Sequence, residues 1–552
     1  MPAVNDGIEV RGSKGGAKGG RSIHATRRFK PGDVIALFDE PAVVLPPGHR
    51  ALEYCNHCLK RQGCAGVGKL RACTGCKTVA YCGAACQKAN WTLIHKVECK
   101  AIQFLHKVKP AHQPDWVPTP IRAGAQVMLR PKLKESFDAL EGHVEEWRKN
   151  DEMDLQLQAH GVLRCCGLDA ITLKGLEESF QVLCKLQTNA FSRTEEDYET
   201  GGVFLDTTLA MINHSCVPNA MVQFGGRTAT LRSATFINPG DEIEISYADH
   251  TQPKGKRQGE LDLYHFECSC YKCEHDLDEY QIAMNDPTID LNNSMSVMPD
   301  IERFKNPPGG GKTDPPQGLM GLNIQKIMPV FPRDMPRDEK REWLRKAYKT
   351  GSYFVTTGKW AIEPFAQVVD EAAYYFGKDR GNHECALAIA CLSAYDIEPF
   401  KHVAPFHPSR LKGLSAIAIA LSNTAPNPGK LTKLARDMAA LKKFPPESVK
   451  LLGNLDQVSL CQMVLSIIDF YSDLTPSADW EPLVLAKEML KDIESLPGRE
   501  KETSLILAWR TDPKTMDDFF RFGLVEPIRT LSELGKVVLE VDLGMDRDLS
   551  AK

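Results

Sequence analysis

The sequence VAYCGAACQKANWTLIHKVEC (residues 79–99) closes a region in which cysteine and histidine recur at short, regular intervals. Ten such residues lie between Cys55 and Cys99, and eight of them form pairs with two or three residues between the partners. The pairs are Cys55/Cys58, Cys73/Cys76, Cys82/Cys86 and His95/Cys99. Ligands at this spacing can turn around one tetrahedral ion, the geometry that zinc requires. The region therefore predicts two closed four-ligand zinc sites.

Residues 86–99 are expected to form a helix that carries the last ligands. His95 and Cys99 lie four positions apart, so a helix places them on the same face. His57 and Cys64 fall outside the pairs and are expected to bind no metal. Because closed sites leave no position for water, we expect both zinc ions to be structural. The alternative, a set of unconnected reduced thiols, does not account for the regular spacing.

The composition favours an intracellular protein of several domains. With 552 residues, 42% of them hydrophobic, the chain can bury the cores of about two to four domains. No apolar run predicts a membrane span, and the N-terminus lacks the apolar region of a secretory signal. The formal net charge of −4 predicts no broad nucleic-acid surface. Most of the 18 cysteines stand in ligand-like spacings, which fits a reducing compartment.

The segments around the zinc region carry both strand and helix signals. Short strands are expected at Val34–Phe38 and Ala42–Leu45. Residues 100–190 are mostly helical in pattern, and one helix is expected to bury a single apolar stripe. That stripe consists of Leu133, Phe137, Leu140, Val144 and Trp147.

The pattern changes twice more toward the C-terminus. From 203 to 247 the hydrophobic period is two, and Gly225-Gly226 is expected to form a hairpin turn. Residues 285–320 are rich in Asn, Pro and Gly and predict a linker. From about 321 to 540 the pattern is helical again, with segments typical of the paired helices of a tetratricopeptide-like array.

Three short motifs indicate a second function-bearing region. They are MINHSCVPNA (211–220), GDEIEISY (240–247) and FECSCYKC (266–273), in that order. Cys268, Cys270 and Cys273 supply three of the four ligands that zinc requires, and Cys216 is the expected fourth. A metal bound by these residues would close a pocket over Asn213 and His214.

In this order, the strands, zinc region, helices and three motifs resemble the SET-and-MYND family of protein lysine methyltransferases. The resemblance implies an α+β fold: a SET β-fold of small pseudoknotted sheets, split by a MYND zinc finger and a helical insert, then a helical TPR-like domain. Specific motifs carry it over about residues 10–275, and helical character alone carries it over 320–552. The implied domains are the N-terminal SET segment (1–50), the finger (51–99), the helical SET insert (100–190), the C-terminal SET segment (191–250), the post-SET zinc segment (251–284), the linker (285–320) and the helical domain (321–552).

The resemblance also implies which ligands share a metal, because the family binds its two finger zincs crosswise. One zinc would take Cys55, Cys58, Cys82 and Cys86, and the other would take Cys73, Cys76, His95 and Cys99. The third structural zinc would take Cys216, Cys268, Cys270 and Cys273.

S-adenosylmethionine is the cofactor that the resemblance implies. Matching positions are the Gly-rich loop Gly19, Gly20 and Arg21, the insert-helix residues Glu141 and His143, then Asn189, Asn213, His214 and Phe266. The family usually has a further Gly where this chain has Ser22. Tyr247 matches the catalytic tyrosine, which also contacts the cofactor, and Tyr264 matches an aromatic residue of the lysine channel.

The implied activity is in-line transfer of a methyl group to the neutral ε-amine of lysine in a histone or non-histone protein. Free lysine has a pKa of about 10.4, so an aromatic channel must favour the neutral amine by desolvation. The finger is expected to bind proteins, including proline-containing peptides. The alternative is an inactive SET/MYND scaffold that binds such peptides in transcriptional regulation. We expect a monomer of the cytoplasm and nucleus, with no membrane partner and no direct nucleic-acid binding.

Overall fold

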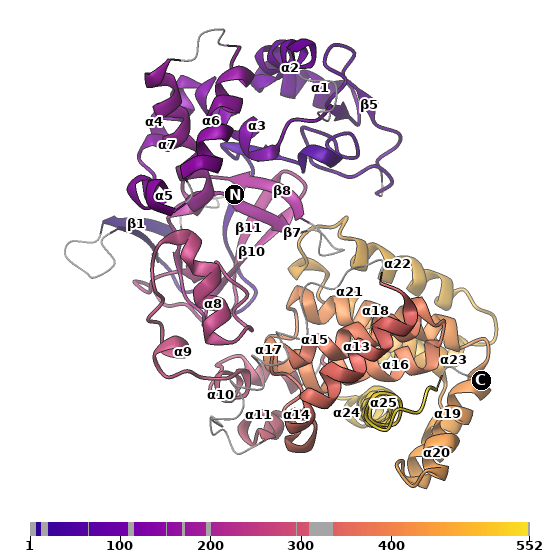
Figure 1. The fold of residues 1–552 in the computed structure, drawn as a ribbon. Helices are drawn as coiled ribbons and strands as arrows, with labels where there is room; N and C mark the ends of the chain where they lie inside the picture. Colours follow the sequence, from indigo (N-terminus) through magenta and orange to yellow (C-terminus); the bar gives the residue numbers. More distant parts are fainter. Residues whose placement is uncertain are drawn as a thin grey trace. The chain divides into compact units, whose positions relative to one another are not determined.

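The computed structural model of the chain consists of two compact units, which are described separately below. The described residues are 7–12, 20–64, 66–108, 115–150, 152–167, 172–194, 200–293, 295–308 and 335–549. The first unit comprises Met1–Tyr247, Gln258–Cys268 and Asp479–Glu481, and the second comprises Ala248–Arg257, Ser269–Ala478 and Pro482–Lys552. All the described strands lie in the first unit, and the second is helical (Figure 1).

Small sheets form the framework of the first unit. The three-stranded sheets have the orders β10-β11-β3 and β4-β8-β7, and the two-stranded sheets are β1-β2, β5-β6 and the parallel pair β9-β12. The strands are β1 Ile8–Gly12, β2 Arg21–Ala25, β3 Val34–Phe38, β4 Val43–Leu45, β5 Arg71–Ala72, β6 Ala80–Tyr81, β7 Phe191–Thr194, β8 Thr200–Leu205, β9 Asn213–His214, β10 Ala220–Gly225, β11 Thr228–Ser233 and β12 Glu244–Ile245.

Both three-stranded sheets join strands from the first 50 residues to strands that follow residue 190. Ile35 on β3, Leu231 on β11 and Phe204 on β8 are fully buried in one hydrophobic core. In chain order, the zinc region and the helical insert therefore lie between strands that pair in the same sheets. The pseudoknotted crossing itself stays a prediction.

The β10/β11 hairpin turns one residue later than expected. Gly225 pairs with Thr228, so the turn residues are Gly226 and Arg227, not Gly225-Gly226. Gly226 has φ +53°, and a Cβ atom there would lie 2.8 Å from the carbonyl oxygen of Cys58. Left-handed backbone and close approach together favour glycine at this position.

Helices dominate the insert that follows the finger. The finger contains α1 Ala84–Asn90, η2 Trp91–His95 and the start of α2 Lys96–Val108. The insert contains the rest of α2, then α3 Thr119–Met128, α4 Pro131–Asp138, α5 Val144–Asn150, α6 Glu152–Cys165 and α7 Leu173–Asn189. Val127 on α3, Val162 on α6 and Leu183 on α7 are fully buried in a shared core. These three helices lie side by side in Figure 1.

The predicted single helix from Leu133 to Trp147 is wrong. Two helices, α4 and α5, share the apolar stripe, and the chain turns between them. The Glu141 carboxylate accepts hydrogen bonds from the backbone N–H groups of Gly142 and His143, and His143 has φ +44°. A side chain that caps the local backbone in this way competes with helix continuation.

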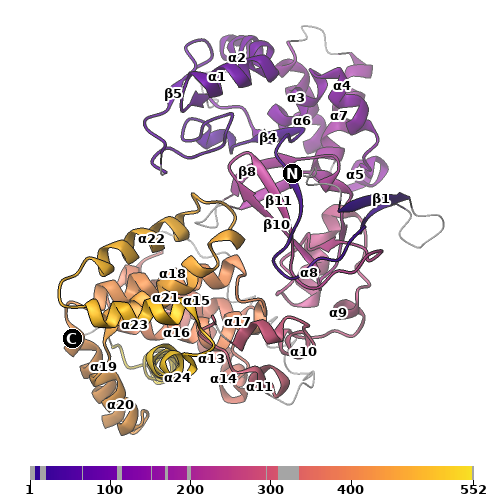
Figure 2. The ribbon, with the colours of Figure 1, turned by 180° about the vertical axis from the view of Figure 1, so that it is seen from behind.

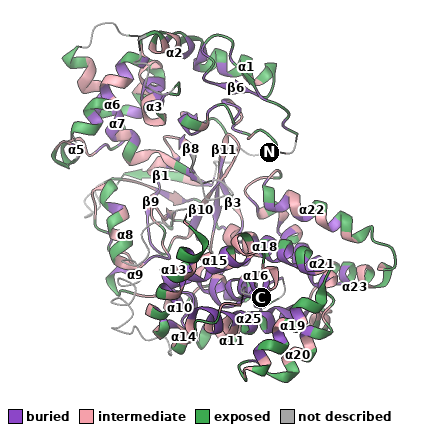
Figure 3. Cartoon of the chain, turned by 45° about the vertical axis from the view of Figure 1, so that its right-hand side comes forward, coloured by how far each residue is buried: buried purple, intermediate pink, exposed green. Residues whose placement is uncertain are grey.

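The second unit is built from packed helices, with buried residues where the helices meet (Figure 3). The α-helices of this unit are α9 Tyr271–Glu274, α10 Glu279–Met284, α11 Ile301–Lys305, α13 Arg337–Thr350, α14 Ser352–Thr357, α15 Phe365–Tyr374, α16 His383–Leu392, α17 Glu398–Lys401, α18 Pro408–Thr424, α19 Pro428–Ala440, α20 Pro446–Gly453, α21 Gln457–Phe470, α22 Glu481–Glu494, α23 Glu500–Thr511, α24 Asp517–Phe520 and α25 Glu526–Leu539. Helix α8, Lys254–Leu261, belongs partly to each unit.

The second unit contains one very close helix crossing. A Cβ atom on Gly535 of α25 would lie 2.4 Å from the carbonyl oxygen of Ala388 on α16, so only glycine allows this contact. Helices α18 and α21 also lie side by side, as Figure 2 shows from behind. A mixed α+β chain with a helical C-terminal region is confirmed, and the tetratricopeptide-like arrangement stays a prediction.

Some of the predicted linker is structured. Residues 289–293 form the short helix η5, and Met295 and Met298 are buried. The amide of Asn292 donates to the carbonyl of Val403 at 2.7 Å and accepts from Arg410 at 2.8 Å. This segment therefore belongs to the core of the second unit, and the Gly/Pro-rich run after residue 308 lies outside the described residues.

No single helix among the described residues has the length and apolar composition of a membrane span. One bent pair, α20 with α21, meets those criteria by length and composition only.

Candidate active site and zinc centres

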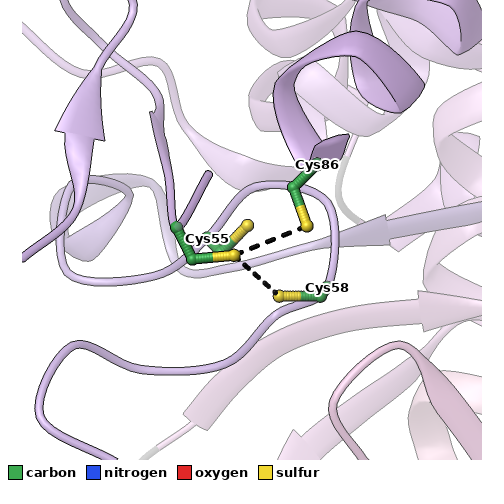
Figure 4. A group of neighbouring side chains, drawn as sticks. Cys55, Cys58 and Cys86 are labelled. Atoms are coloured by element: carbon green, nitrogen blue, oxygen red, sulfur yellow. Dashed lines mark hydrogen bonds between the residues drawn. The ribbon is translucent and has the colours of Figure 1, made fainter. Parts of the chain in front are cut away.

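The first finger cluster brings Cys55, Cys58, Cys82 and Cys86 together, with all four sulfur atoms within 4.8 Å of one another. Cys82 follows β6 directly, and Cys86 stands in the first turns of α1. The sulfur of Cys82 lies 3.8 Å from that of Cys58 and 3.5 Å from that of Cys86. Figure 4 shows the sulfur atoms of Cys55, Cys58 and Cys86 facing one another. Four thiols at these distances fit a tetrahedral zinc ion.

The second finger cluster contains Cys73, Cys76, His95 and Cys99, all buried. The sulfur atoms of Cys73 and Cys99 are 3.8 Å apart, and Nε2 of His95 lies 3.6 Å from the sulfur of Cys76. The imidazole therefore turns Nε2 toward the thiols, as a zinc ligand must. Neither His57 nor Cys64 belongs to a potential metal cluster in the described portion of the chain.

A buried polar network supports this second cluster. Nδ1 of His95 lies 2.9 Å from Glu98, whose carboxylate takes two hydrogen bonds from Arg122 on α3, at 2.7 and 3.0 Å. Gln126 donates to the same carboxylate at 2.8 Å. Burial alone would raise the pKa of Glu98, but the positive charge of Arg122 and these hydrogen bonds outweigh burial and hold the pKa below its usual range.

Glu98 thus orients the histidine of the second cluster, as carboxylates behind metal ligands do. Arg122 also donates to the side-chain oxygen of Asn56 at 2.7 Å, which ties the helical insert to the finger. The sequence analysis did not select Glu98 or Arg122. The available signal was the position of Glu98, three residues after His95 on the same helix face.

The third cluster brings Cys216, Cys268, Cys270 and Cys273 within 4.8 Å of one another. Nε2 of His214 lies 3.2 Å from the sulfur of Cys216. Three four-ligand clusters therefore fit three zinc ions, and the donor sets match the crosswise assignment that the resemblance implies.

Aromatic side chains gather beside the third cluster. The ring of Tyr247 lies 4.7 Å from that of Tyr264 and 5.3 Å from that of His214, measured between centroids. Phe266 stands edge-on to Tyr247 at 6.4 Å. We call these four residues the Tyr247 cluster. They come from three separate segments, so the fold, not local sequence, assembles them.

Hydrogen bonds fix the orientation of the Tyr247 cluster. The backbone N–H of Tyr247 donates to Nδ1 of His214 at 2.9 Å, which leaves the ring proton on Nε2, facing Cys216. The hydroxyl of Tyr247 donates to the carbonyl of Ile212. Burial, with the charges of Tyr264 and Glu242 adding to it, raises the pKa of Tyr247, so this residue is a neutral phenol at physiological pH.

Asn213 lies next to this cluster on β9. Its amide donates to the carboxylate of Glu242 at 2.6 Å, and its strand pairs with β12, which ends two residues before Tyr247. The sequence motifs NH and GDEIEISY are therefore neighbours in space, although 26 residues separate Asn213 from Gly240 in the numbering.

The remaining predicted cofactor residues surround the turn between α4 and α5. Asn189, the last residue of α7, donates to the carbonyl of Glu141 at 2.6 Å, and Arg21 donates to the carbonyl of Ala139. Glu141 and His143 stand in this turn and not on the insert helix, so that expectation is corrected. Hydrogen bonds from His143 and Gly142 N–H groups lower the pKa of Glu141. Gly20 precedes β2, and Gly19 lies outside the described residues.

His265 lies between the turn that joins α4 to α5 and the Tyr247 cluster. Its ring lies 5.4 Å from His143 and 4.9 Å from Trp147, and its chain neighbours Tyr264 and Phe266 belong to the Tyr247 cluster. The left-handed backbone of His265, at φ +54°, turns adjacent side chains in different directions. Sequence reasoning did not select His265, because nothing local distinguishes it.

Comparisons with known proteins show which families this sequence is similar to. A family model described as MYND finger matches residues 55–99. The chain is 30% identical over 282 residues to histone-lysine N-methyltransferase ASHR1 of Arabidopsis thaliana, covering 48% of this chain and 56% of that protein. It is 31% identical over 266 residues to histone-lysine N-methyltransferase SMYD3 of Homo sapiens, covering 47% and 60%. It is 32% identical over 238 residues to SET domain and MYND-type zinc finger protein 6 of Schizosaccharomyces pombe, covering 42% and 47%.

The match spans about half the length of these curated relatives. The chain carries a MYND finger, and its resemblance to the SET-and-MYND family of lysine methyltransferases is confirmed over about half of its residues.

Proposed function

We propose that this chain transfers a methyl group from S-adenosylmethionine to the ε-amine of lysine in a protein substrate. Two independent lines support the proposal: the similarity to lysine methyltransferases and the assembly of the Tyr247 cluster. The single observation that carries it is the Tyr247 hydroxyl, which is oriented by the Ile212 carbonyl among aromatic rings.

Polar groups of suitable chemistry are available for the cofactor. Asn213, Asn189 and the Glu141 turn offer amide and carbonyl groups for a ribose, an adenine and an amino acid moiety. At Gly20 and Arg21 the protein backbone would lie close to the carboxylate of the cofactor's amino acid moiety. The face of Phe266 would pack against the adenine. When bound, S-adenosylmethionine supplies an electrophilic methyl group on a positive sulfur.

Tyr247 would orient the substrate amine and would not act as a base. The Tyr247 hydroxyl donates its hydrogen bond to the Ile212 carbonyl, so the lone pairs of its oxygen remain available to accept a hydrogen bond from an N–H of the lysine amine. That hydrogen bond would direct the amine lone pair along the line of transfer. Tyr264 and Phe266 would exclude water, and desolvation favours the neutral amine that the reaction needs. The proton lost from lysine would leave through water.

The zinc ions would be structural and take no part in the reaction. Each has four protein ligands available, so no coordination position is left for a substrate. The finger would bind protein partners, including proline-containing peptides. A histone and a non-histone protein are both proposed substrate classes, and the proposed setting is a monomer in the cytoplasm and nucleus.

A radioactive-methyl assay tests the proposal directly. Purified protein is incubated with tritiated S-adenosylmethionine and either core histones or a cell lysate, and labelled lysines are identified by mass spectrometry. Lysine methylation that disappears in Tyr247→Phe supports the enzyme. Calorimetry with S-adenosylmethionine distinguishes the enzyme from the inactive scaffold. A scaffold that binds no cofactor would give no heat of binding in calorimetry and no labelled lysine in the methylation assay.

A further inference from the structure

The helix that carries His95 and Cys99 of the second finger cluster has an outward side that neither the metal clusters nor the Tyr247 cluster uses. Segments η2 and α2 run continuously from Trp91 to Val108. Their inner side carries His95, Glu98 and Cys99, all buried. The outer side belongs to the same rigid element but faces solvent.

Apolar and cationic residues form two parallel rows on this outer side. Leu93, Val97 and Phe104 are 43%, 49% and 38% exposed. Lys96, Lys100 and Lys107 are exposed too, and each follows one of these apolar residues by three positions. Residues three apart are neighbours on the surface of an α-helix, so on α2 Val97 and Phe104 each have a lysine beside them. Leu93 extends the apolar row into the π-helical segment η2. We call these six residues the finger helix face.

The finger helix face carries positive charge without compensation from its own helix. Glu98, the acidic residue between Trp91 and Lys107, is buried and paired with Arg122. No ion pair joins the three lysines to another residue in the portion of the chain that the structure describes. Lys88 on α1, eight residues before Lys96, is a further exposed cation. The face thus combines an apolar row with a net charge that an acidic partner would neutralise.

We propose that the finger helix face binds an acidic amphipathic helix of a partner protein. From Leu93 to Lys107 the face is about 21 Å long, which matches about four turns of a docked helix. Apolar residues of the partner at i, i+3 or i+4, and i+7 would cover the apolar row. Glutamates flanking them would meet the lysine row, and charge complementarity would set the orientation and speed of association.

Charge and burial favour this occupant over two others. Lipid insertion requires side chains that reach about 5–10 Å into the headgroup region, but Leu93, Val97 and Phe104 are less than half exposed. A nucleic acid would neutralise the lysines but leave the apolar row against phosphates and water. Only an amphipathic acidic helix satisfies both rows at once.

This surface goes beyond the proposed function, since it requires neither cofactor nor methyl transfer. It also differs in chemistry from a proline-peptide site, which needs aromatic residues to grip extended backbone. A partner held here would be attached through a zinc-anchored helix. The face therefore offers a way to recruit a substrate or a regulator without touching the Tyr247 cluster.

The test uses the full-length protein and two labelled 20-residue helical peptides of designed sequence. One places leucines at i, i+3 and i+7 with flanking glutamates, and the other replaces every glutamate by lysine. Fluorescence anisotropy measures binding at low and high salt. The wild-type protein should bind the glutamate peptide, more weakly at high salt.

A charge-reversal variant of the finger helix face is the most discriminating test. Lys96→Glu/Lys100→Glu should weaken binding of the glutamate peptide about tenfold or more and create binding of the lysine peptide. The matched control is Lys69→Glu/Lys77→Glu, which makes the same charge change at two exposed finger residues away from the helix. Phe104→Ser tests the apolar row alone. Metal content and circular dichroism verify that each variant is folded.

Three results would overturn the inference. The first is no binding of the glutamate peptide by the wild-type protein at about 100 μM. The second is equal loss in the helix-face and control variants, which would indicate non-specific attraction. The third is sedimentation with phosphatidylserine vesicles that depends on Lys96, Lys100 and Phe104, which would assign the face to a membrane instead.

Discussion

The zinc-held finger and the Tyr247 cluster lie in the same unit but are stabilised by different forces. The finger has very short strands, β5 and β6, and relies on two ligand clusters and the buried Glu98–Arg122 pair. The Tyr247 cluster relies on aromatic packing and on hydrogen bonds between side chains and backbone. This difference predicts that substitutions in the finger reduce stability, whereas substitutions in the Tyr247 cluster reduce the rate of methyl transfer.

The largest effect on stability is expected from Arg122→Met. The variant leaves the Glu98 carboxylate buried without its cation, which costs about 3–5 kcal/mol of unfolding free energy. Urea unfolding, followed by circular dichroism, measures the change. The matched control is Arg148→Met, which breaks the more exposed pair with Glu177 and should cost about 1 kcal/mol or less. Similar losses in both variants would contradict the structural role of the Glu98–Arg122 pair.

Tyr247→Phe should change the rate and not the stability. Losing one hydroxyl should slow methyl transfer about a hundredfold or more, equivalent to about 3 kcal/mol, because the amine loses its orienting hydrogen bond. Single-turnover kinetics with labelled cofactor measures the rate, and zinc content should stay unchanged. Tyr471→Phe is the control, since Tyr471 also donates to a carbonyl, that of Met295 in the second unit. Near wild-type methylation by Tyr247→Phe would remove this residue from the reaction.

A smaller effect is expected from Asn213→Ala on cofactor affinity. The variant removes a candidate cofactor contact and leaves the Glu242 carboxylate without its 2.6 Å donor. A loss of about 1–2 kcal/mol, or about tenfold in affinity, is expected by calorimetry. Asn285→Ala, at a helix end in the second unit, makes the same chemical change away from the site and should have no effect. If both variants bind S-adenosylmethionine equally well, Asn213 is not a cofactor residue.

The two finger clusters should release zinc at different rates. Cys82 in the first cluster is exposed, whereas all four ligands of the second are buried. A chelator therefore reaches the first ion more easily, and we expect the two finger ions to leave in separate phases whose rates differ about tenfold, or about 1.4 kcal/mol in barrier. A colorimetric zinc indicator follows both phases. Cys82→Ser should abolish the fast phase only, and loss of the slow phase instead would reverse the assignment.

What the sequence predicts and what it misses follow from the range of each interaction. Ligand pairs such as Cys55/Cys58 are close in the chain, so spacing alone identifies them. The Glu98–Arg122 pair joins residues 24 positions apart on different helices, and no local pattern indicates it. The helix predicted across Glu141 fails for a related reason, because an apolar stripe does not reveal that a carboxylate caps its own backbone at Gly142.

The smallest effect is expected from Cys64→Ser, which tests how strictly the finger selects its ligands. Cys64 lies within the finger but outside both clusters, so its thiol should contribute no metal bond. Purified variant protein should retain three zinc ions by mass spectrometry, and its unfolding free energy should stay within about 0.5 kcal/mol of wild type. Cys73→Ser is the contrasting variant, because it leaves an ion with three ligands and should lose one zinc. Loss of zinc from Cys64→Ser would mean that ligand spacing is an insufficient guide in this finger.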